Sequence, residues 1–457
     1  MLYSSPLPYL VDSGAYFEAV RDLPWAAWLD SGGRDRFDII VAQPVATLTT
    51  RGKITEIVLG EGKIESSAEP IALVQEMLGK RLDAIPELPF AGGALGYWSY
   101  DLGRLYHHVS DLISINNDPP AMAVGIYDWA IVIDHQQANA RLVSRLRYPE
   151  TEKSLVQIRA RIATVMAKVS TQRAAFSVIG KIRSDLSRED YRFAFDKVKA
   201  YLKEGDCYQV NLAQRFSAQA KGDTFEAYRT MRISNPAPYS AYLEYPELHI
   251  LCASPERFLK VKQNKVETKP IKGTRPRSHD AEEDRRLSEE LRTHSKDRAE
   301  NLMIVDLLRN DLSRSCEVGS VRTPKLFEVE SFANVHHLVS TVEGRLADGH
   351  DALDVLRDCF PGGSITGAPK LRAMQIIEEL ESQRRGIYCG AIGYVGFDGN
   401  MDSNIAIRTL TLKDGELSCW AGGGIVADSE CEAEYQETLD KASAMLQLMQ
   451  RFGGSAF

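Results

Sequence analysis

The chain lacks the signals of a membrane protein, a disulfide-bonded secreted protein or a zinc protein. No apolar run approaches the roughly 18 residues of a membrane-spanning helix. The first residues show no basic region followed by an apolar core, as a secretory signal would. The seven cysteines are scattered without a Cys-x-x-Cys pair, and the nine histidines have no metal-ligand spacing. We therefore expect a cytoplasmic protein without disulfides or a zinc centre.

An excess of positive charge is also absent. The formal net charge is −8 over 457 residues, which argues against a nucleic-acid-binding face but allows a local basic pocket.

The loop 362–370 has the Gly-x4-Gly spacing of a phosphate-binding loop. However, Ala368 and Pro369 intervene before its lysine, and Leu371 stands where serine or threonine should bind magnesium. This excludes a nucleotide-binding ATPase as far as that motif defines one.

Strands come in runs, with helices between and outside them. Helices are expected over 15–30, 187–203, 281–312, 352–359, 371–382 and 430–451. Strands are expected over 37–42, 45–50, 90–97, 121–134, 140–147, 207–216, 241–245, 249–253, 390–397, 403–413 and 416–421. This order predicts an α+β fold rather than alternating βαβ units.

One polar and charged segment, 150–186, is the best candidate for a domain boundary. It is rich in Lys, Arg, Gln and Ser after a helical stretch. Just beyond it, a serine followed by acidic residues at 187–190 is typical of a helix start. The sequence therefore predicts an amino-terminal domain over 1–170 and a second domain over 187–450.

Two of the expected helices carry paired acidic residues. Asp297 and Glu300 are three residues apart, and so are Glu434 and Glu437, so each pair shares one helix face. If the two faces meet, about four carboxylates would suit a hard, oxygen-preferring cation such as Mg²⁺. The alternative is a pair of solvated, salt-bridged faces. The largely apolar segment 303–308 is expected to bury the first helix, which favours the metal site.

A lysine and a glutamate are candidates for direct chemistry. Lys272, in Pro-Ile-Lys-Gly-Thr at an expected strand end, could act as a nucleophile only if burial or a cationic neighbour keeps it neutral. Taken alone, such a lysine is most often a surface residue. Glu256 is a candidate general acid or base. Its alternative is a salt bridge to Arg257 or Lys260.

The segment 421–426 contains three consecutive glycines after an expected strand. Glycines let backbone N–H groups approach a ligand closely and form a nest for an anion. A simple turn explains the same residues equally well, so both interpretations stay open at this point.

Taken together, these segments closely resemble the family of chorismate-utilising enzymes. The resemblance is strong over 187–445 and weaker before it. It rests on segments 254–258, 270–274, 297–310, 337–340, 367–370, 421–426 and 434–441. The resemblance implies a large antiparallel β-sheet sandwich core with helices on the outside. It also implies the substrate chorismate, which carries two carboxylates and a 4-hydroxyl leaving group.

Position 272 separates the branches of this family. Anthranilate-forming members carry Pro-Ile-Ala-Gly-Thr, whereas members that aminate C4 carry Pro-Ile-Lys-Gly-Thr, as this chain does. The segments 125–130 and 206–216 also resemble the second branch. The resemblance thus implies attack of Lys272 at C2, Glu256 as general acid, and 4-amino-4-deoxychorismate as the product for p-aminobenzoate and folate. Anthranilate or isochorismate formation stays an alternative, as does a non-catalytic chorismate or tryptophan sensor.

The resemblance also implies roles for the remaining site residues. The metal ligands would be Glu300 and Glu437, with Asp297 and Glu434 acting through water. The substrate-binding residues would be Gly273, Thr274, His337, Tyr388, Arg408, Gly422, Gly424 and Lys441. Among them Arg408 suits a carboxylate because its guanidinium offers a bidentate fork.

A source of ammonia is missing from the chain. No cysteine lies in a Gly-x-Cys-x-Gly elbow of the glutaminase kind, and the nearest, Cys389 before Gly390, falls in a strand-like stretch. We therefore expect a separate glutamine amidotransferase subunit as partner. Free ammonia should substitute for that subunit at high concentration.

Two further segments resemble the tryptophan pocket of anthranilate-forming enzymes. They are 29–31 and 235–239, and they indicate Ser31, Pro238, Tyr239 and Ser240 as pocket residues. Asp30 stands where those enzymes carry glutamate, so feedback control is not implied. The pocket would hold tryptophan as a structural ligand, or the segments would only pack two domains together.

Overall fold

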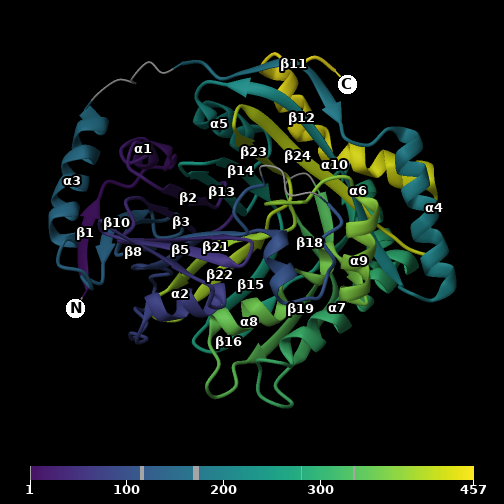
Figure 1. Cartoon of the computed structure of the whole chain (residues 1–457), viewed down its shortest axis with the longest axis horizontal. Helices are drawn as coiled ribbons and strands as arrows, with labels where there is room; N and C mark the ends of the chain where they lie inside the picture. The colour runs from purple at the N-terminus through teal and green to yellow at the C-terminus, as the bar shows by residue number, and fades with distance from the viewer. Residues whose placement is uncertain (1, 114–117, 168–173, 279, 333–334, 457) are drawn as a thin grey trace.

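Two twelve-stranded sheets form the centre of the molecule (Figure 1). The computed structural model describes residues 2–113, 118–167, 174–278, 280–332 and 335–456. The first sheet has the order β1 (Tyr3–Leu7), β10 (Asn139–Ser144), β9 (Trp129–Asp134), β3 (Phe37–Val41), β2 (Ala26–Asp30), β13 (Tyr239–Glu244), β14 (His249–Ser254), β23 (Thr409–Lys413), β24 (Glu416–Ile425), β12 (Gln209–Lys221) and β11 (Ser177–Ser184), with β20 (Gly367–Ala368) beside β12.

The second sheet is built in the same way, with antiparallel neighbours throughout the named strands of both sheets. Its order is β17 (Ile271–Pro276), β19 (Val335–Arg345), β16 (Lys265–Thr268), β15 (Arg257–Lys262), β22 (Met401–Ile405), β21 (Ala391–Gly396), β7 (Gly93–Trp98), β8 (Met122–Tyr127), β4 (Ala46–Arg51), β5 (Ile54–Leu59) and β6 (Gly62–Ser66), with β18 (Arg322–Ser331) beside β19.

Helices lie outside the two sheets (Figure 1). They are α1 (Gly14–Glu18), α2 (Pro70–Leu78), α3 (Thr151–Ala167), α4 (Arg188–Glu204), α5 (Thr224–Ser234), α6 (Ala281–Thr293), α7 (Ser295–Leu312), α8 (Ala352–Cys359), α9 (Lys370–Leu380) and α10 (Cys431–Arg451), with 3₁₀ turns η1 (Tyr100–Leu105) and η2 (Gly363–Ile365). None of the helices in the described ranges is long and apolar enough to cross a membrane.

The hydrophobic core is divided into layers by the alternation of side chains along the strands. In β13, Tyr242 packs outward with α1, α3, α5 and α10, whereas Ala241 and Leu243 pack inward between the two sheets. The outer face of the second sheet packs against α2, α7 and α8. The predicted α+β fold with an antiparallel sandwich core and outer helices is therefore confirmed.

Strands from both halves of the chain share each sheet. Residues of β2 pair with β13 in the first sheet, and β7 pairs with β21 in the second. The predicted boundary segment contains α3 and β11, while 168–173 lies outside the described residues. The division into domains 1–170 and 187–450 stays a prediction, and the sheets do not follow it.

Two expected helices differ in the structure. The helix expected over 15–30 is wrong: only α1 is helical, and Ala26–Asp30 forms β2. Trp28 packs into the outer core and Ala27 into the inner core, so both faces are apolar and the sequence shows a run that does not distinguish helix from strand. The helix expected over 281–312 is interrupted at His294, whose extended backbone separates α6 from α7.

Four predictions about strands and the segments beside them also need correction. The strands expected over 121–134 and 403–413 each split, because the chain passes from one sheet to the other at Asp128 and at residues 406–408. The glycines 422–424 lie inside β24 and pair with β12, so they form neither the nest nor the turn. Cys389 precedes β21 with a φ of +65°, outside any strand.

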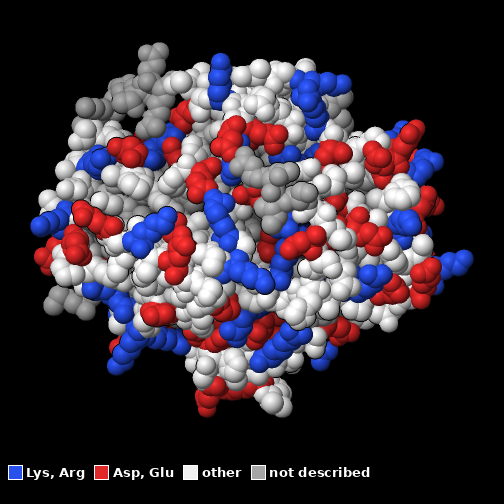
Figure 2. All heavy atoms as spheres, viewed as in Figure 1, with Lys and Arg blue, Asp and Glu red and all other residues white. Residues whose placement is uncertain are grey.

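The surface has no dominant charge on the face shown in Figure 2, where acidic and basic side chains are intermixed. All seven cysteines are free thiols, and six of them are buried.

Candidate active site

One pocket of about 510 Å³ is lined by every residue predicted to bind substrate or metal or to react. These residues are Glu256, Lys272, Gly273, Thr274, Asp297, Glu300, His337, Tyr388, Arg408, Gly422, Gly424, Glu434, Glu437 and Lys441. Both segments that carry the chain between the sheets here, 255–256 and 406–408, contribute to the lining. The volume suits a small organic ligand, since such pockets usually span roughly 300–1,000 Å³.

The two candidate reactive groups are joined through Ser364. Lys272 Nζ donates to the Ser364 carbonyl oxygen at 3.0 Å, and Ser364 Oγ donates to Glu256 Oε1 at 2.8 Å. Burial lowers the pKa of Lys272, although the nearby carboxylates of Glu256 and Glu300 oppose the shift. Burial also raises the pKa of Glu256, which is only 7% exposed. Both shifts favour the uncharged form, as a nucleophilic amine and a general acid require.

The alternative explanation for Glu256, a surface salt bridge, is not what the structure contains. Arg257 pairs instead with Asp402 at 3.0 Å and with Glu267 at 3.4 Å. Lys260 also lies nearest Asp402, at 3.9 Å. The Glu256 side chain therefore turns away from both cations into the pocket.

A buried ion pair between Arg385 and Glu381 contacts the turn that carries Ser364 and stabilises it. Arg385 and Glu381 are 2.7 Å apart, and each side chain is 1% exposed. Arg385 also donates to the carbonyl oxygens of Ile365 at 2.9 Å and Asn211 at 2.7 Å. An ion pair so fully hydrogen-bonded restricts the turn, and with it the position of Ser364.

Gly273 forms a bulge that brings Lys272 and Thr274 to the pocket. Its φ is +75°, and a Cβ there would lie 2.8 Å from both Asp297 Cγ and Leu291 Cδ1. The register with β19 shifts between Lys272 and Thr274. Thr274 Oγ1 shares a hydrogen bond of 2.9 Å with His337 Nδ1. No other side chain fits at position 273, because both the backbone angle and the space require glycine.

His337 is buried beside the bulge, and burial together with the positive charge of Arg408 lowers its pKa to about 4. Its imidazole is therefore neutral near pH 7. A neutral ring can donate or accept one hydrogen bond without adding charge to an anionic ligand.

The paired acids of α7 and α10 face the same pocket. Burial raises the pKa of Glu300, and the charges of Asp297 and Glu434 add to the shift. Burial likewise raises the pKa of Glu434, with Glu437 adding to it. Gly423 lies directly beneath them, since a Cβ there would be 3.1 Å from Glu434 Oε2. The glycine in β24 thus makes room for the carboxylates.

Cationic side chains accompany these carboxylates. Lys441 Nζ lies 2.6 Å from Glu437 Oε1, and Lys296 Nζ lies 3.8 Å from Glu434 Oε1. In the described part of the chain, no three His, Cys, Asp or Glu side chains stand close enough to hold a metal ion as they are. The all-oxygen donor set fits Mg²⁺ chemically. The carboxylates can surround a cation only if Lys441 moves away from Glu437 and Lys296 moves away from Glu434.

The pocket also contains a further cation, Arg408, and two aromatic rings, Tyr388 and Trp420. Arg408 has a φ of +50° and no ion-pair partner among the described residues, and burial lowers its pKa. Its side chain opens toward the pocket. The Tyr388 ring stacks on Trp420 with centroids 6.0 Å apart and an interplanar angle of 7°. Lys441 Nζ also donates to the Gly422 carbonyl oxygen at 3.1 Å.

Several pocket residues had no role in the sequence interpretation. Ser364 and Trp420 line the pocket, as do Lys296, His294 and Arg275. The last two contact Asp297 Oδ2 at 3.0 and 3.2 Å. Ser364 lies in the glycine loop that was tested only as a phosphate-binding loop, so its signal was present in the sequence.

A second pocket of about 480 Å³ is lined by Ser31, Pro238, Tyr239 and Ser240, together with Asp30. These are the residues predicted for a tryptophan pocket. Its walls come from β2 and β13 of the first sheet and from β15 and β22 of the second.

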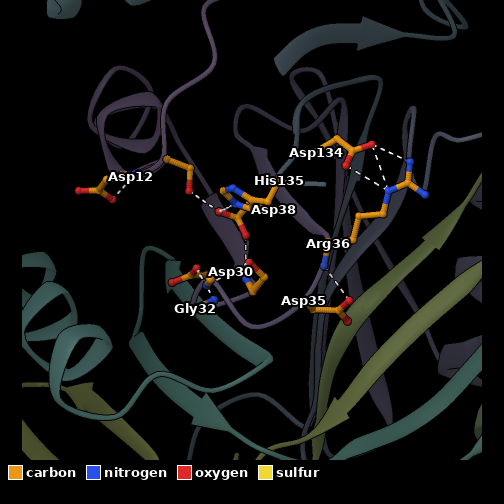
Figure 3. Close-up of polar contacts among 12 residues, drawn as sticks. Asp12, Asp30, Gly32, Asp35, Arg36, Asp38, Asp134 and His135 are labelled. Atoms are coloured by element: carbon orange, nitrogen blue, oxygen red, sulfur yellow. Dashed lines mark hydrogen bonds and ion pairs between the residues drawn. The ribbon is translucent and has the colours of Figure 1, made fainter. Parts of the chain in front are cut away.

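A buried polar cluster supports one edge of this second pocket (Figure 3). Asp38 accepts hydrogen bonds from the Ser31 backbone at 2.7 Å, from His135 Nε2 at 3.0 Å and from the Ser13 hydroxyl. Burial and the charge of Asp38 raise the pKa of Asp30, which accepts from Arg232 Nε at 2.6 Å. This network fixes the backbone of Ser31 at the pocket edge.

The chain matches known proteins over nearly its whole length. A profile of the family described as chorismate binding enzyme matches residues 26–447. "Aminodeoxychorismate synthase component 1" of Klebsiella aerogenes is 50% identical over 96% of this chain and 97% of its own. The protein of the same name from Escherichia coli (strain K12) is 47% identical over 95% and 96%.

A solved structure gives the same result. Anthranilate synthase component I from Streptococcus pneumoniae TIGR4 superimposes with a TM-score of 0.79 and 34% identity, covering 90% of this chain and 92% of its own. Sequence and structure therefore agree that this chain belongs to the family of chorismate binding enzymes.

Proposed function

We propose that the chain aminates chorismate at C4 with ammonia and gives 4-amino-4-deoxychorismate, a precursor of p-aminobenzoate and folate. The names of the relatives that share about half of its residues support this reaction. The observation that carries the proposal is the buried Lys272, linked through Ser364 to Glu256. A chorismate or tryptophan sensor would have no use for a desolvated nucleophile beside an acid.

The reaction proceeds by two displacements. Neutral Lys272 attacks C2 and forms a C–N bond, the ring double bonds shift, and the C4–O bond breaks. Glu256 donates the proton with which the hydroxyl leaves as water. Ammonia then adds at C4, the double bonds shift back, and the bond to Lys272 breaks as the added nitrogen loses its extra proton. The nitrogen thus ends para to the ring carboxylate.

The remaining residues bind and orient the substrate. Arg408 and Tyr388 hold the enolpyruvyl carboxylate together with backbone groups of Gly422 and Gly424, since Arg408 has no carboxylate partner among the residues that the structure describes. Lys441 supplies positive charge toward the ring carboxylate. Thr274 and His337 line the ring, where a neutral imidazole adds hydrogen bonding without charge.

Magnesium is part of the same proposal. Glu300 and Glu437 would hold it directly, with Asp297 and Glu434 through water. When bound, Mg²⁺ neutralises the repulsion between the acidic helices and the ring carboxylate of the substrate. Burial raises the pKa of Glu300 and of Glu434 despite the lysines nearby, and this supports the role, because a bound cation would stabilise the ionised form of both carboxylates.

The ammonia comes from a separate glutamine amidotransferase subunit in this proposal. Burial raises the pKa of Cys389, the nearest candidate for a glutaminase nucleophile, to about 12, so its thiolate is strongly disfavoured. The free thiols throughout the chain fit a cytoplasmic location, which we also propose.

Intact-mass spectrometry under denaturing conditions tests the mechanism. After incubation with chorismate and Mg²⁺, wild-type protein should gain the mass of chorismate less one water, and Lys272→Ala should gain none. Lys269→Ala is a matched control, because Lys269 lies three residues away and pairs with Glu330 at 3.1 Å. A wild type without adduct, together with a Lys272→Ala variant fully active in C4 amination, would refute the covalent route. Chromatography of the product separates the alternatives of anthranilate and isochorismate.

The second pocket is proposed to bind tryptophan as a structural ligand. Titration with tryptophan should raise the melting temperature, and Ser31→Trp should remove the shift by filling the pocket. Interdomain packing without a ligand predicts a melting temperature that does not respond to tryptophan.

A further inference from the structure

Asn211 lines the active-site pocket, although the proposed mechanism assigns it no part. The residue lies on β12 and is only 7% exposed. Its side-chain oxygen Oδ1 is buried and has no hydrogen-bond partner among the residues that the structure describes. A buried amide oxygen without a donor costs free energy, so a ligand that supplies the donor is favoured.

The backbone of Asn211 is held against the turn that carries Ser364. Its N–H donates to the Thr366 carbonyl oxygen at 2.8 Å. Arg385 donates to the carbonyl oxygens of both Asn211, at 2.7 Å, and Ile365, at 2.9 Å. One guanidinium thus holds β12 beside the turn, and the Asn211 side chain extends from a restrained backbone at the pocket wall.

The same turn binds the candidate general acid. Ser364 Oγ donates to Glu256 Oε1 at 2.8 Å, two residues before the contact between Thr366 and Asn211. Glu256 and Asn211 therefore line the pocket beside one short turn, although they lie far apart in the sequence. Rotation about the Cβ–Cγ bond of Asn211 exchanges its amide oxygen and nitrogen, so either can face a ligand.

The 4-hydroxyl is the one hydrogen-bond donor of chorismate at neutral pH, because the two carboxylates and the ether oxygen only accept. In the proposed reaction this hydroxyl takes a proton from Glu256 and leaves as water. To take the proton, its oxygen must turn a lone pair toward Glu256, so its own hydrogen must point elsewhere. An acceptor close to Glu256 fixes that orientation. Arginine and charged lysine side chains only donate, whereas an amide oxygen accepts.

We propose that the Asn211 amide oxygen accepts a hydrogen bond from the 4-hydroxyl of chorismate and so turns the hydroxyl oxygen toward Glu256. This inference rests on the proposed function. As Glu256 transfers its proton, the C4–O bond breaks, its electron pair stays on the oxygen, and water leaves. Proton transfer makes the oxygen more positive until that electron pair reaches it, so the contact with Asn211 strengthens in the transition state. Asn211 is therefore a catalytic residue of the first displacement.

Two ligands separate this contact from general packing. Chorismate and the analogue with hydrogen in place of the 4-hydroxyl carry the same charge, and calorimetry measures both dissociation constants with Mg²⁺. The full chain carries Lys272→Ala, so that no adduct forms. With Asn211 in place, we expect the analogue to bind about fivefold to tenfold more weakly than chorismate. With Asn211→Leu, which removes the amide at similar volume, the two ligands should bind within about twofold of each other.

Three variants control this comparison. Gln219→Leu makes the same replacement at the exposed end of β12 and should keep the difference between the ligands. Asn211→Asp keeps an oxygen acceptor of the same shape and should also keep it, because the added charge affects both ligands equally. Asn211→Ala repeats the loss of the amide with a smaller side chain, in case Asn211→Leu does not fold.

The rate of the first displacement tests the catalytic part. With Lys272 intact and chorismate saturating, rapid-quench mass spectrometry should show adduct formation slowed by about tenfold in Asn211→Leu, the equivalent of about one hydrogen bond. Variants without the amide that still distinguish the two ligands as Asn211 does would overturn the contact. A wild type that forms no amino product from chorismate and ammonia would instead refute the proposed function, while the two dissociation constants would still report on Asn211.

Discussion

Ser364 contacts both groups on which the proposed chemistry depends. Its carbonyl oxygen accepts from Lys272, and its hydroxyl donates to Glu256. A hydrogen bond donated to a carboxylate stabilises the ionised form, so the hydroxyl partly opposes the burial that raises the pKa of Glu256. The side chain of Ser364 thus adjusts the acid, while its backbone positions the nucleophile.

Ser364→Ala separates these two functions. The backbone contact to Lys272 remains, but Glu256 loses a donor, so its pKa should rise further above the usual glutamate value. If Glu256 acts in its protonated form, activity declines as pH rises through that pKa, and this decline should move to higher pH in the variant. We expect kcat at the optimum to fall by roughly tenfold, the equivalent of about one hydrogen bond, with KM for chorismate little changed.

The pH profile of kcat measures this shift, and Ser364→Thr, which keeps the hydroxyl, should restore much of the wild-type profile. A profile identical to wild type in Ser364→Ala would mean that Glu256 does not depend on this hydroxyl.

At the scale of elements, the acidic faces of α7 and α10 both line the active-site pocket. In the metal-free protein the raised pKa values of Glu300 and Glu434 mean that protonation favours the folded state. Stability from these groups therefore declines as pH rises from the usual glutamate value through the raised ones. A bound cation should reverse this trend, because it stabilises the ionised carboxylates.

Added Mg²⁺ should therefore raise the melting temperature more at pH 8 than at pH 5. Saturation at a hundredfold above the dissociation constant corresponds to about 2.7 kcal/mol, and chelation should remove the gain. Glu300→Gln should weaken the response. Glu432→Gln is the matched control, since Glu432 is exposed on α10 and pairs with Arg188 outside the pocket. An equal Mg²⁺ response in both variants would argue against the proposed ligands.

The sequence predicts an element well where the chain stays within one sheet or helix, and poorly where the chain passes from one sheet to the other. The three-residue spacing of acids predicted the shared faces of α7 and α10, and strands such as β3 and β4 were predicted near their observed bounds. The points at which the chain crosses from one sheet to the other were not predictable. They depend on which sheet each strand joins, and distant partner strands decide this. Arg408 reaches the pocket through a left-handed backbone that no local pattern indicates. The glycines of β24 resembled a loop because their partners, β12 and the carboxylates of α10, are distant in sequence.

At the scale of the whole molecule, the two halves of the chain share both sheets. The first sheet joins them where β2 pairs with β13, and the second where β7 pairs with β21. The seams are central strands with apolar side chains on both faces, such as Trp28 and Ala27 in β2. The active-site pocket lies entirely on residues after 187, yet β14, which leads into Glu256, follows directly from the seam strand β13.

A fragment spanning 187–457 should therefore not fold alone, although it contains every proposed catalytic residue. Removal of the first half leaves β13 and β21 as long, apolar sheet edges, which favour aggregation. We expect the fragment to lack a cooperative thermal transition and to bind a hydrophobic dye, whereas the intact chain melts cooperatively. Co-expression with a fragment of residues 1–186, which also carries β11, should restore soluble, active protein, because the seam partners are then present. A cooperative transition in the isolated 187–457 fragment, raised by Mg²⁺, would instead show that the second half is an independent domain and that the shared sheets are dispensable for the site.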